Sequence, residues 1–166
     1  MVKSAAAADR RTEILKSAAA AFRRRGYHGA SVDEIASALE MTKGNLYYYF
    51  RNKEEIVDAL FEQFEREIDG LLDAPQDRAI TFEDAWLFLH LLFESIWRYR
   101  FVYRDLNDLL SRNRKLELHF RTILERKSRT AHRLLSSLAD QKQLKAEPQE
   151  LEALATNMVV VTTWWL

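Results

Sequence analysis

The sequence has little of what β-structure and cysteine chemistry require. Among 166 residues there is no cysteine, and glycine and proline together number six, whereas average usage would give about 20. Without cysteine, disulfides, cysteine-ligated zinc and a thiol nucleophile are excluded. So few glycines and prolines argue against the tight turns of a β-sandwich or barrel. We therefore expect an all-α protein.

Long apolar runs and catalytic motifs are missing as well. No stretch approaches the roughly 18 consecutive apolar residues of a spanning helix, and the Ala5–Ala8 run is too short for a signal peptide. The sequence contains no nucleophile elbow, phosphate-binding loop or metal-ligand spacing. We expect a soluble cytoplasmic protein without a membrane partner, metal, cofactor or enzymatic activity.

The net charge is zero, but the charges are unevenly distributed. Residues 1–53 hold 10 basic and 5 acidic side chains, and residues 54–166 hold 15 and 20. Taken alone, this asymmetry fits a solvated helical surface as well as a binding surface. It nevertheless points to the N-terminal third as the region where a polyanionic partner would bind.

Apolar spacing and capping residues predict four helices in the first 72 residues. The first ends at Gly26, the second and third are short, and the fourth is long. In the third helix the inward positions are Leu46 and Phe50. The predicted starts of the four helices, at residues that cap helix N-termini, are Thr12, Ser31, Thr42 and Asn52.

Three further helices are predicted beyond Pro75. Residues 81–103 are dense in apolar and aromatic side chains, which favours a buried helix. Residues 116–138 are amphipathic, and Pro148 suits the first turn of a last helix. Because the sequence stops within an apolar stretch, we expect the natural chain to continue beyond Leu166.

The first three helices have the layout of a helix-turn-helix, whose second helix enters the major groove of DNA. With Leu46 inward and 100° per residue, Gly44 and Tyr48 of the third helix face outward. Lys43 and Tyr47 form one flank of this face, and Asn45 and Tyr49 form the other. Asparagine can read adenine, lysine can reach guanine or phosphate, and tyrosine hydroxyls bond phosphate. The third helix is therefore predicted to contact DNA.

Residues 14–56 resemble the DNA-binding domain of the tetracycline-repressor (TetR) family. The similarity rests on "AFRRRGY", "SVDEIA" and "KGNLYYYFRNKEEI", the last being similar to the family's Leu-Tyr-x-x-Phe-x-x-Lys pattern, and covers about a quarter of the chain. It implies phosphate contacts by Ser31 and Lys53, and anchoring of the DNA backbone by Tyr47 and Tyr48. It also implies base-edge contacts by Lys43, Gly44, Asn45 and Tyr49, and Thr42 completes the predicted DNA-binding set.

Some of these assignments have structural alternatives. The tyrosines at positions 47–49 could pack against the long fourth helix, and Lys53 could be a helix-start residue on the solvated surface. The sequence departs from the family at Tyr49, where histidine is frequent, and at Glu40, where glycine is usual. A left-handed backbone at Glu40 would cost roughly 1–2 kcal/mol.

The resemblance further implies two domains. The first, at residues 1–52, would bind DNA and have an ordered core at about 10–52. The second, at residues 53–166, would be a helical bundle for ligand binding and dimerisation. The alternative for each aromatic of the second domain is an ordinary bundle core, and for His90 a core histidine with satisfied hydrogen bonds. The predicted effector pocket comprises Trp86, His90, Phe93, Trp97, Tyr103, Arg104 and Asn107.

The last helices have apolar faces that favour a homodimer. Such a dimer would hold two reading helices about 34 Å apart, to match a pseudo-palindromic operator. The predicted function is a transcriptional repressor that a small apolar or aromatic ligand releases from double-stranded DNA. Alternatives are a regulator that dimerises without an effector, and an all-helical enzyme or lipid-binding bundle. The predicted dimer interface comprises Leu151, Leu154, Met158, Thr162 and Trp165.

Overall fold

The computed structural model describes residues 2–73 and 79–164, with side chains from residue 7 onward. Every regular element within these ranges is an α-helix, which confirms the all-α prediction. In chain order the helices are α1 (Val2–Gly29), α2 (Val32–Ser37), α3 (Lys43–Tyr49), α4 (Lys53–Leu72), α5 (Phe82–Arg98), α6 (Arg100–Arg104), α7 (Leu106–Arg112), α8 (Arg114–Asp140) and α9 (Pro148–Trp164).

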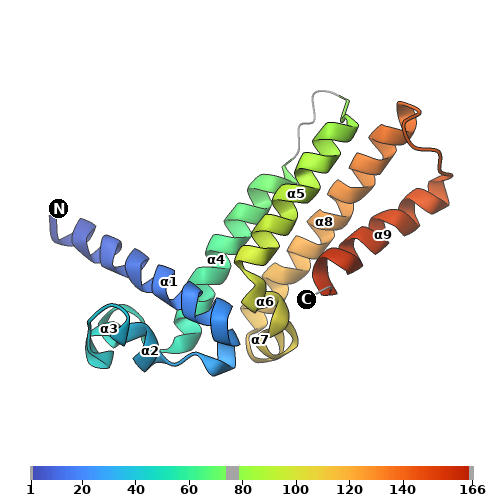
Figure 1. Ribbon diagram of the computed structural model, residues 1–166. Helices are drawn as coiled ribbons and strands as arrows, with labels where there is room; N and C mark the ends of the chain where they lie inside the picture. The colour runs from blue at the N-terminus through green and yellow to red at the C-terminus, as the bar shows by residue number, and fades with distance from the viewer. Residues whose placement is uncertain (1, 74–78, 165–166) are drawn as a thin grey trace.

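Helices α1, α2 and α3 form a head at one end of an elongated molecule, and α4 leads from the head into the body (Figure 1). The head has an apolar centre in which Phe22 and Phe50 are completely buried. Three predicted caps are confirmed, because the side chains of Ser31, Thr42 and Asn52 each accept a hydrogen bond from the backbone N–H three residues later. These caps define where α2, α3 and α4 begin.

Helix α1 begins at Val2, so the predicted start at Thr12 is wrong. Thr12 lies inside the helix, and its hydroxyl donates to the Ala8 carbonyl oxygen at 3.0 Å. Alanine and arginine, which are frequent upstream of Thr12, have high helix propensities and extend the helix. At Gly26, where we predicted the helix to end, the backbone kinks with φ 74° and ψ 172° before continuing to Gly29.

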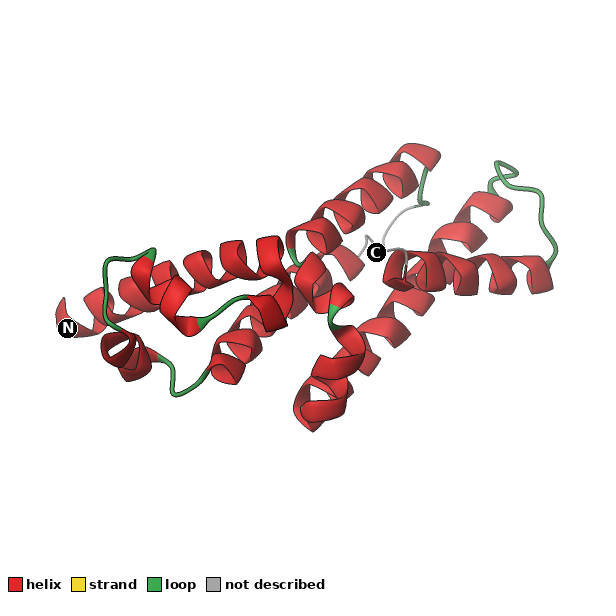
Figure 2. Cartoon of the chain, turned by 60° about the horizontal axis from the view of Figure 1, so that its bottom comes forward, coloured by secondary structure: helices red, strands yellow, loops and turns green. Residues whose placement is uncertain are grey.

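The body is a bundle in which α4, α5, α8 and α9 run alongside one another, and the short α6 and α7 close the end nearest the head (Figures 1 and 2). Aromatic rings meet at its centre, with the Tyr103 centroid 5.7 Å from Phe64 and 6.0 Å from Phe120. The amphipathic helix predicted at residues 116–138 is α8, and the helix predicted to start at Pro148 is α9.

The prediction of one buried helix at residues 81–103 is wrong in two respects. The segment is divided at Tyr99 into α5 and α6, and α5 is buried along a single stripe that contains Leu92, Ser95 and Ile96. Trp86 and Trp97 lie outside this stripe, and 67% and 54% of their surfaces are exposed. A high density of aromatic residues therefore does not bury a helix on all sides, because burial follows the 3.6-residue period.

The described helices differ from membrane-spanning segments. None of the helices in residues 2–73 and 79–164 combines the length and the apolar character needed to cross a bilayer.

Candidate DNA-binding face and effector site

Helix α3 is held on the head from two sides. Leu46 and Phe50 are completely buried beneath it, as the predicted helical phase requires. On the other side, the Arg11 guanidinium of α1 lies 4.0 Å from the centre of the Phe50 ring and donates to the Tyr49 carbonyl oxygen at 2.7 Å. Arg10 donates to the Leu39 carbonyl oxygen in the turn between α2 and α3. The beginning of α1 thus fixes the orientation of α3.

Arg10 and Arg11 are positioning residues that the sequence analysis missed. We predicted the helix to start after them, at Thr12, which would leave both side chains in an irregular segment. The usable signal was the helix propensity of residues 5–11, which extends the helix past both arginines and brings them beside α3. Their partners are backbone carbonyls, and no sequence pattern marks a carbonyl as a partner.

The outer face of α3, which comprises Lys43, Gly44, Asn45, Tyr47 and Tyr48, is exposed. Of the Tyr48 surface 82% is exposed, and of the Tyr47 surface 39%. A Cβ added at Gly44 would meet no atom within 4 Å, so packing inside the chain does not require glycine there. An exposed helix face that presents an amide, an ammonium and two phenols is suited to hydrogen bonding with base edges and phosphates.

The Lys43 side chain is charged and forms an ion pair with Asp33 of α2. Its ammonium lies 2.9 Å from the Asp33 carboxylate, and this hydrogen bond raises the pKa of Lys43. Both side chains are about half exposed or more. A base or phosphate that approaches Lys43 must therefore compete with one exposed carboxylate, and exposed pairs of this kind contribute little stability.

The hydroxyls of Ser31 and Thr42 both act as helix caps. Each oxygen accepts a backbone N–H, from Glu34 at 3.0 Å and from Asn45 at 3.2 Å. An accepting hydroxyl keeps its own proton, so each can still donate to a phosphate oxygen. The Glu34 side chain, three residues after Ser31, pairs with Arg24 of α1 at 2.8 Å.

Two predicted contact residues are less available than the others. Tyr49 is half-buried and packed against the hydrophobic core, and its ring meets that of Tyr48 edge to face at 5.2 Å. The Lys53 ammonium donates to the Ala30 carbonyl oxygen at 2.7 Å and lies 4.3 Å from the centre of the Tyr27 ring. Burial lowers the pKa of Lys53. A phosphate contact by Lys53 would have to use its two remaining protons.

Glu40 occupies the turn between α2 and α3 with φ 53°. This is the left-handed backbone considered from the sequence, in which a side chain costs roughly 1–2 kcal/mol. We expect Glu40→Gly to raise the free energy of unfolding by about 0.5–1 kcal/mol, because glycine relieves the strain but adds entropy to the unfolded chain. Urea unfolding measures this change. Glu40→Ala is the control, since it removes the charge but keeps the strain, and an equal gain from both variants would contradict the strain argument.

The predicted effector pocket does not exist as a unit in the described structure. Trp86, His90, Trp97, Arg104 and Asn107 are exposed. His90 pairs with Glu94 at 3.5 Å on the surface of α5, so it is neither a pocket residue nor a core histidine. Phe93 is half-buried, and only Tyr103 lies in the interior. The prediction is wrong because it grouped residues by aromatic content, whereas the phase of α5 turns most of them outward.

The predicted dimer interface is also corrected. Leu151 and Thr162 are buried on the side of α9 that packs against α8, and Met158 is half-buried between α9 and α5. Leu154 is 40% exposed, and Trp165 lies outside the described residues. The apolar stripe of α9 faces its own bundle, and the large apolar residues that this helix exposes are Leu154, Val160, Val161 and Trp164.

The head is joined to the body through the C-terminal part of α1. We call Phe22, Gly26 and Tyr27 of α1, with Phe101 and Asp105 at α6, the head–body junction. The Phe22 and Phe101 rings lie 5.3 Å apart, and the Asp105 carboxylate accepts the Tyr27 backbone N–H at 2.6 Å. A movement of α6 would therefore reach α1 directly.

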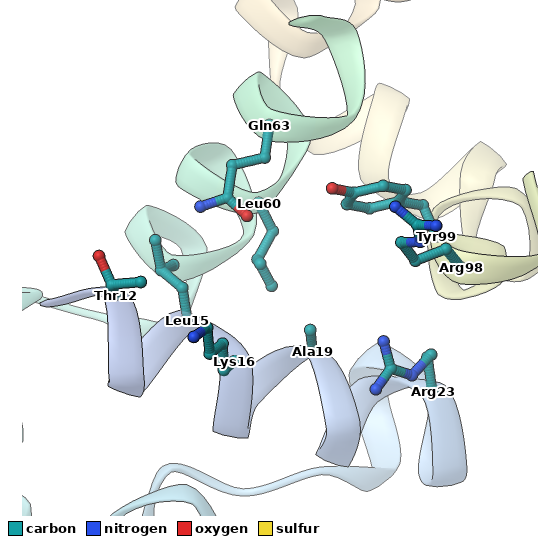
Figure 3. Close-up of a pocket in the computed structure, with 9 residues that line it drawn as sticks. All are labelled: Thr12, Leu15, Lys16, Ala19, Arg23, Leu60, Gln63, Arg98 and Tyr99. Atoms are coloured by element: carbon teal, nitrogen blue, oxygen red, sulfur yellow. The ribbon is translucent and has the colours of Figure 1, made fainter. Parts of the chain in front are cut away.

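Beside this junction, a cleft of about 310 Å³ separates α1 from α4 and α5 (Figure 3). The side chains of Leu15 and Ala19 face it from α1, and those of Leu60 and Tyr99 face it from the body. Its remaining lining residues are polar or charged and lie near solvent, which is typical of a surface groove. The cleft leaves room beside the junction for a change in the angle between α1 and α5.

The described side chains offer no metal centre. Within residues 7–73 and 79–164, no three His, Asp or Glu side chains are grouped so that they could hold a metal ion.

Two family models match the chain. The model described as "Bacterial regulatory proteins, tetR family" matches residues 14–60, and the TetR model described as "Bacterial transcriptional repressor" matches residues 63–166. Among curated proteins, the uncharacterized HTH-type transcriptional regulator YhgD of Bacillus subtilis is 30% identical over 76 residues, which are 46% of this chain and 40% of that protein. The matches to the first curated relatives span between 28% and 40% of their lengths.

Solved structures share this fold over most of the chain. A TetR-family transcriptional regulator from Marinobacter aquaeolei VT8 has a TM-score of 0.85 at 35% identity, over 92% of this chain and 76% of that chain. AibR, whose crystal structure is a complex with isovaleryl coenzyme A and operator DNA, has a TM-score of 0.67 at 21% identity, over 93% and 86% of the two chains. Because one family model covers residues 63–166 and another the head, this chain belongs to the TetR family of bacterial transcriptional regulators.

Proposed function

We propose that this protein is a sequence-specific transcriptional repressor that a small effector with apolar or aromatic character releases from its operator. The observation that carries the proposal is the outer face of α3. Its amide, ammonium and phenol groups are exposed while the opposite side of the same short helix is completely buried. In a helix-turn-helix, such a face lies in the major groove.

The individual groups suit different parts of a duplex. Asn45 carries both a donor and an acceptor, as a bidentate contact with adenine requires. Tyr48 is the most exposed aromatic residue of the head, and an exposed phenol hydroxyl on this face can bond phosphate oxygens. We therefore assign base readout to Asn45 and positioning on the DNA backbone to Tyr48.

The proposed division of labour follows the two parts of the molecule. Residues 1–52 would bind DNA in the cytoplasm, and residues 53–166 would bind the effector and dimerise. The exposed apolar residues of α9 support a homodimer, since contiguous apolar surface favours association. A two-fold dimer would present two α3 helices to successive major grooves, about 34 Å apart, on a pseudo-palindromic operator.

The head–body junction supports regulation by an effector. A ligand that prefers one position of α6 would shift the position of α1, and its differential affinity for the two states would weaken operator binding. The complex of AibR with isovaleryl coenzyme A and operator DNA is an example, on the same fold, of one protein with both kinds of partner.

Selection of bound duplexes from a random pool tests the proposal. We expect one pseudo-palindromic sequence to be enriched. The affinity of the protein for this duplex should fall steeply between about 50 and 200 mM salt, because each neutralised phosphate contributes about −0.9 to the slope of log binding constant against log salt concentration. Failure to enrich any duplex, or a slope near zero, would contradict the proposed function.

The roles of two residues on the outer face are separable. We expect Asn45→Ala to reduce the preference for one base at one operator position by about 1–3 kcal/mol. We expect Tyr48→Phe to weaken binding to all duplexes by the same factor. Competition between the selected duplex and its single-base variants measures both effects. Equal losses on every duplex from both substitutions would refute the assigned roles.

A further inference from the structure

Lys127 is a buried cation without a carboxylate partner among the described residues. Only 3% of its surface is exposed, and its ammonium donates to the Thr162 carbonyl oxygen and the Thr163 hydroxyl, each at 3.1 Å. Burial lowers the pKa of Lys127 to about 7. An ionised amine with neutral partners in an apolar interior is costly, and an anion in the same place would remove most of that cost.

Two buried hydroxyls, one in α6 and one in α5, lack hydrogen-bond partners among the described residues. The Tyr103 hydroxyl in α6 is one, and the centre of the Tyr103 ring lies 5.8 Å from the Lys127 ammonium. The Ser95 hydroxyl is the other, one turn after Leu92 in α5 and on the same buried stripe. Most buried polar groups are paired, so two orphaned donors on helices that border a cation without a carboxylate partner indicate that an acceptor belongs between these helices.

The ammonium lies at the edge of an apolar seam between α5, α8 and α9. Phe88, Leu92, Ala131, Met158 and Val159 line this seam together with Lys127. It encloses only about 10 Å³, which is room for no more than about one water molecule. A larger occupant must separate α5 from α9.

We propose that the effector is a small organic acid, whose carboxylate binds the Lys127 ammonium and accepts hydrogen bonds from Tyr103 and Ser95 while its apolar part enters the seam between α5 and α9. This inference rests on the proposed function, since it names the chemical class of the effector. Two of the three polar groups lie in α5 and α6, so binding would act on the segment that reaches the head.

The route from the acid to the head is short. Tyr103 lies in α6 two residues from Phe101, which packs on Phe22 of α1, and two residues from Asp105, which holds the Tyr27 backbone. An occupant that moves α5 and engages Tyr103 therefore displaces the head–body junction. The acid would thus bias the position of α1 and, through it, operator binding.

Affinity for the acid should depend on pH. Among the described groups that face Lys127, the titratable one is Tyr103 of α6, whose pKa burial raises, so it stays protonated. The groups from α5 and α9 are apolar side chains, hydroxyls and a carbonyl. A carboxylate prefers the protonated amine, so the dissociation constant should increase about tenfold between pH 6 and pH 8 as Lys127 loses its proton.

Thermal melting with matched ligands tests the proposal. Octanoate and 3-phenylpropionate are compared with octanamide and 3-phenylpropionamide, which have the same apolar parts without the charge. We expect the acids to raise the melting temperature of the wild type, and the amides to require about tenfold or higher concentrations for the same rise. Equal action of acids and amides, no rise with either acid, or an acid response that strengthens from pH 6 to pH 8 would overturn the proposal.

Three variants locate the response. Lys127→Met should abolish the preference for acids over amides, and Tyr103→Phe, which keeps the ring, should weaken acid binding about tenfold. Lys115→Met, on an exposed part of the same helix, should behave as the wild type. An unchanged acid preference in Tyr103→Phe overturns the assignment even if Lys127→Met does not fold.

Adding the same acids and amides to the duplex selection separates this proposal from the function on which it rests. If the wild type enriches a duplex but acids and amides release it equally, the acid proposal fails and the repressor proposal stands. If the wild type enriches no duplex, the repressor proposal fails, whatever the ligands do to the melting temperature.

Discussion

Phe22→Ala is expected to lower the free energy of unfolding by about 3–5 kcal/mol, the loss typical of a large buried aromatic side chain. Phe22 is completely buried and joins the head to the body, with its ring 5.9 Å from Tyr27 and 5.3 Å from Phe101. Because these neighbours come from both parts, a cavity there cannot close without moving α1 relative to α6. Urea unfolding followed by circular dichroism measures the loss.

Tyr48→Ala is the matched control for Phe22→Ala. It also truncates an aromatic side chain to alanine within the head, but 82% of the Tyr48 surface is exposed. We expect its effect on the free energy of unfolding to stay within about 0.5 kcal/mol. Similar losses in the two variants would mean that Phe22 does not hold the two parts together.

Gly26→Ala is expected to lower the free energy of unfolding by about 1–3 kcal/mol. With φ 74° and ψ 172°, Gly26 has a backbone conformation that is essentially restricted to glycine. An added Cβ would also lie 3.1 Å from the Arg104 guanidinium and 3.2 Å from the Asp105 carboxylate. The substitution therefore strains the backbone where Asp105 accepts the Tyr27 N–H.

Gly70→Ala is the matched control for Gly26→Ala, and the opposite change in the free energy of unfolding is expected. Gly70 lies in α4, and a Cβ there would meet no atom within 4 Å. Alanine has the higher helix propensity, so Gly70→Ala should raise the free energy of unfolding by about 0.5–1 kcal/mol. A gain in both variants, measured by urea unfolding, would contradict the conformational argument at Gly26.

The predictions that the structure confirms rest on local signals. Ser31, Thr42 and Asn52 were identified as caps because a capping side chain and the N–H it accepts are three residues apart in every helix. Leu46 and Phe50 were identified as inward for the same kind of reason, since the helical period relates neighbours on one face. Such signals need no knowledge of the rest of the fold.

The predictions that fail concern which neighbour covers a helix. Trp86 and His90 were assigned to a pocket because they lie in an aromatic segment, yet the buried stripe of α5 is formed by Leu92, Ser95 and Ile96. Leu151 and Thr162 were assigned to a dimer interface, yet they are buried within their own bundle. An apolar stripe predicts that something covers it, but the same hydrophobic pattern serves a core and an interface.

The sequence by itself determined the helical class, the starts of α2, α3 and α4 and the outward face of α3, because helix caps and the 3.6-residue period are properties of neighbouring residues. Only the tertiary structure placed Arg11 of α1 against Phe50, Phe22 against Phe101, and Lys127 beside Tyr103. Each of these contacts joins segments far apart in the chain. Their geometry follows from how whole helices pack, which no local pattern of side chains specifies.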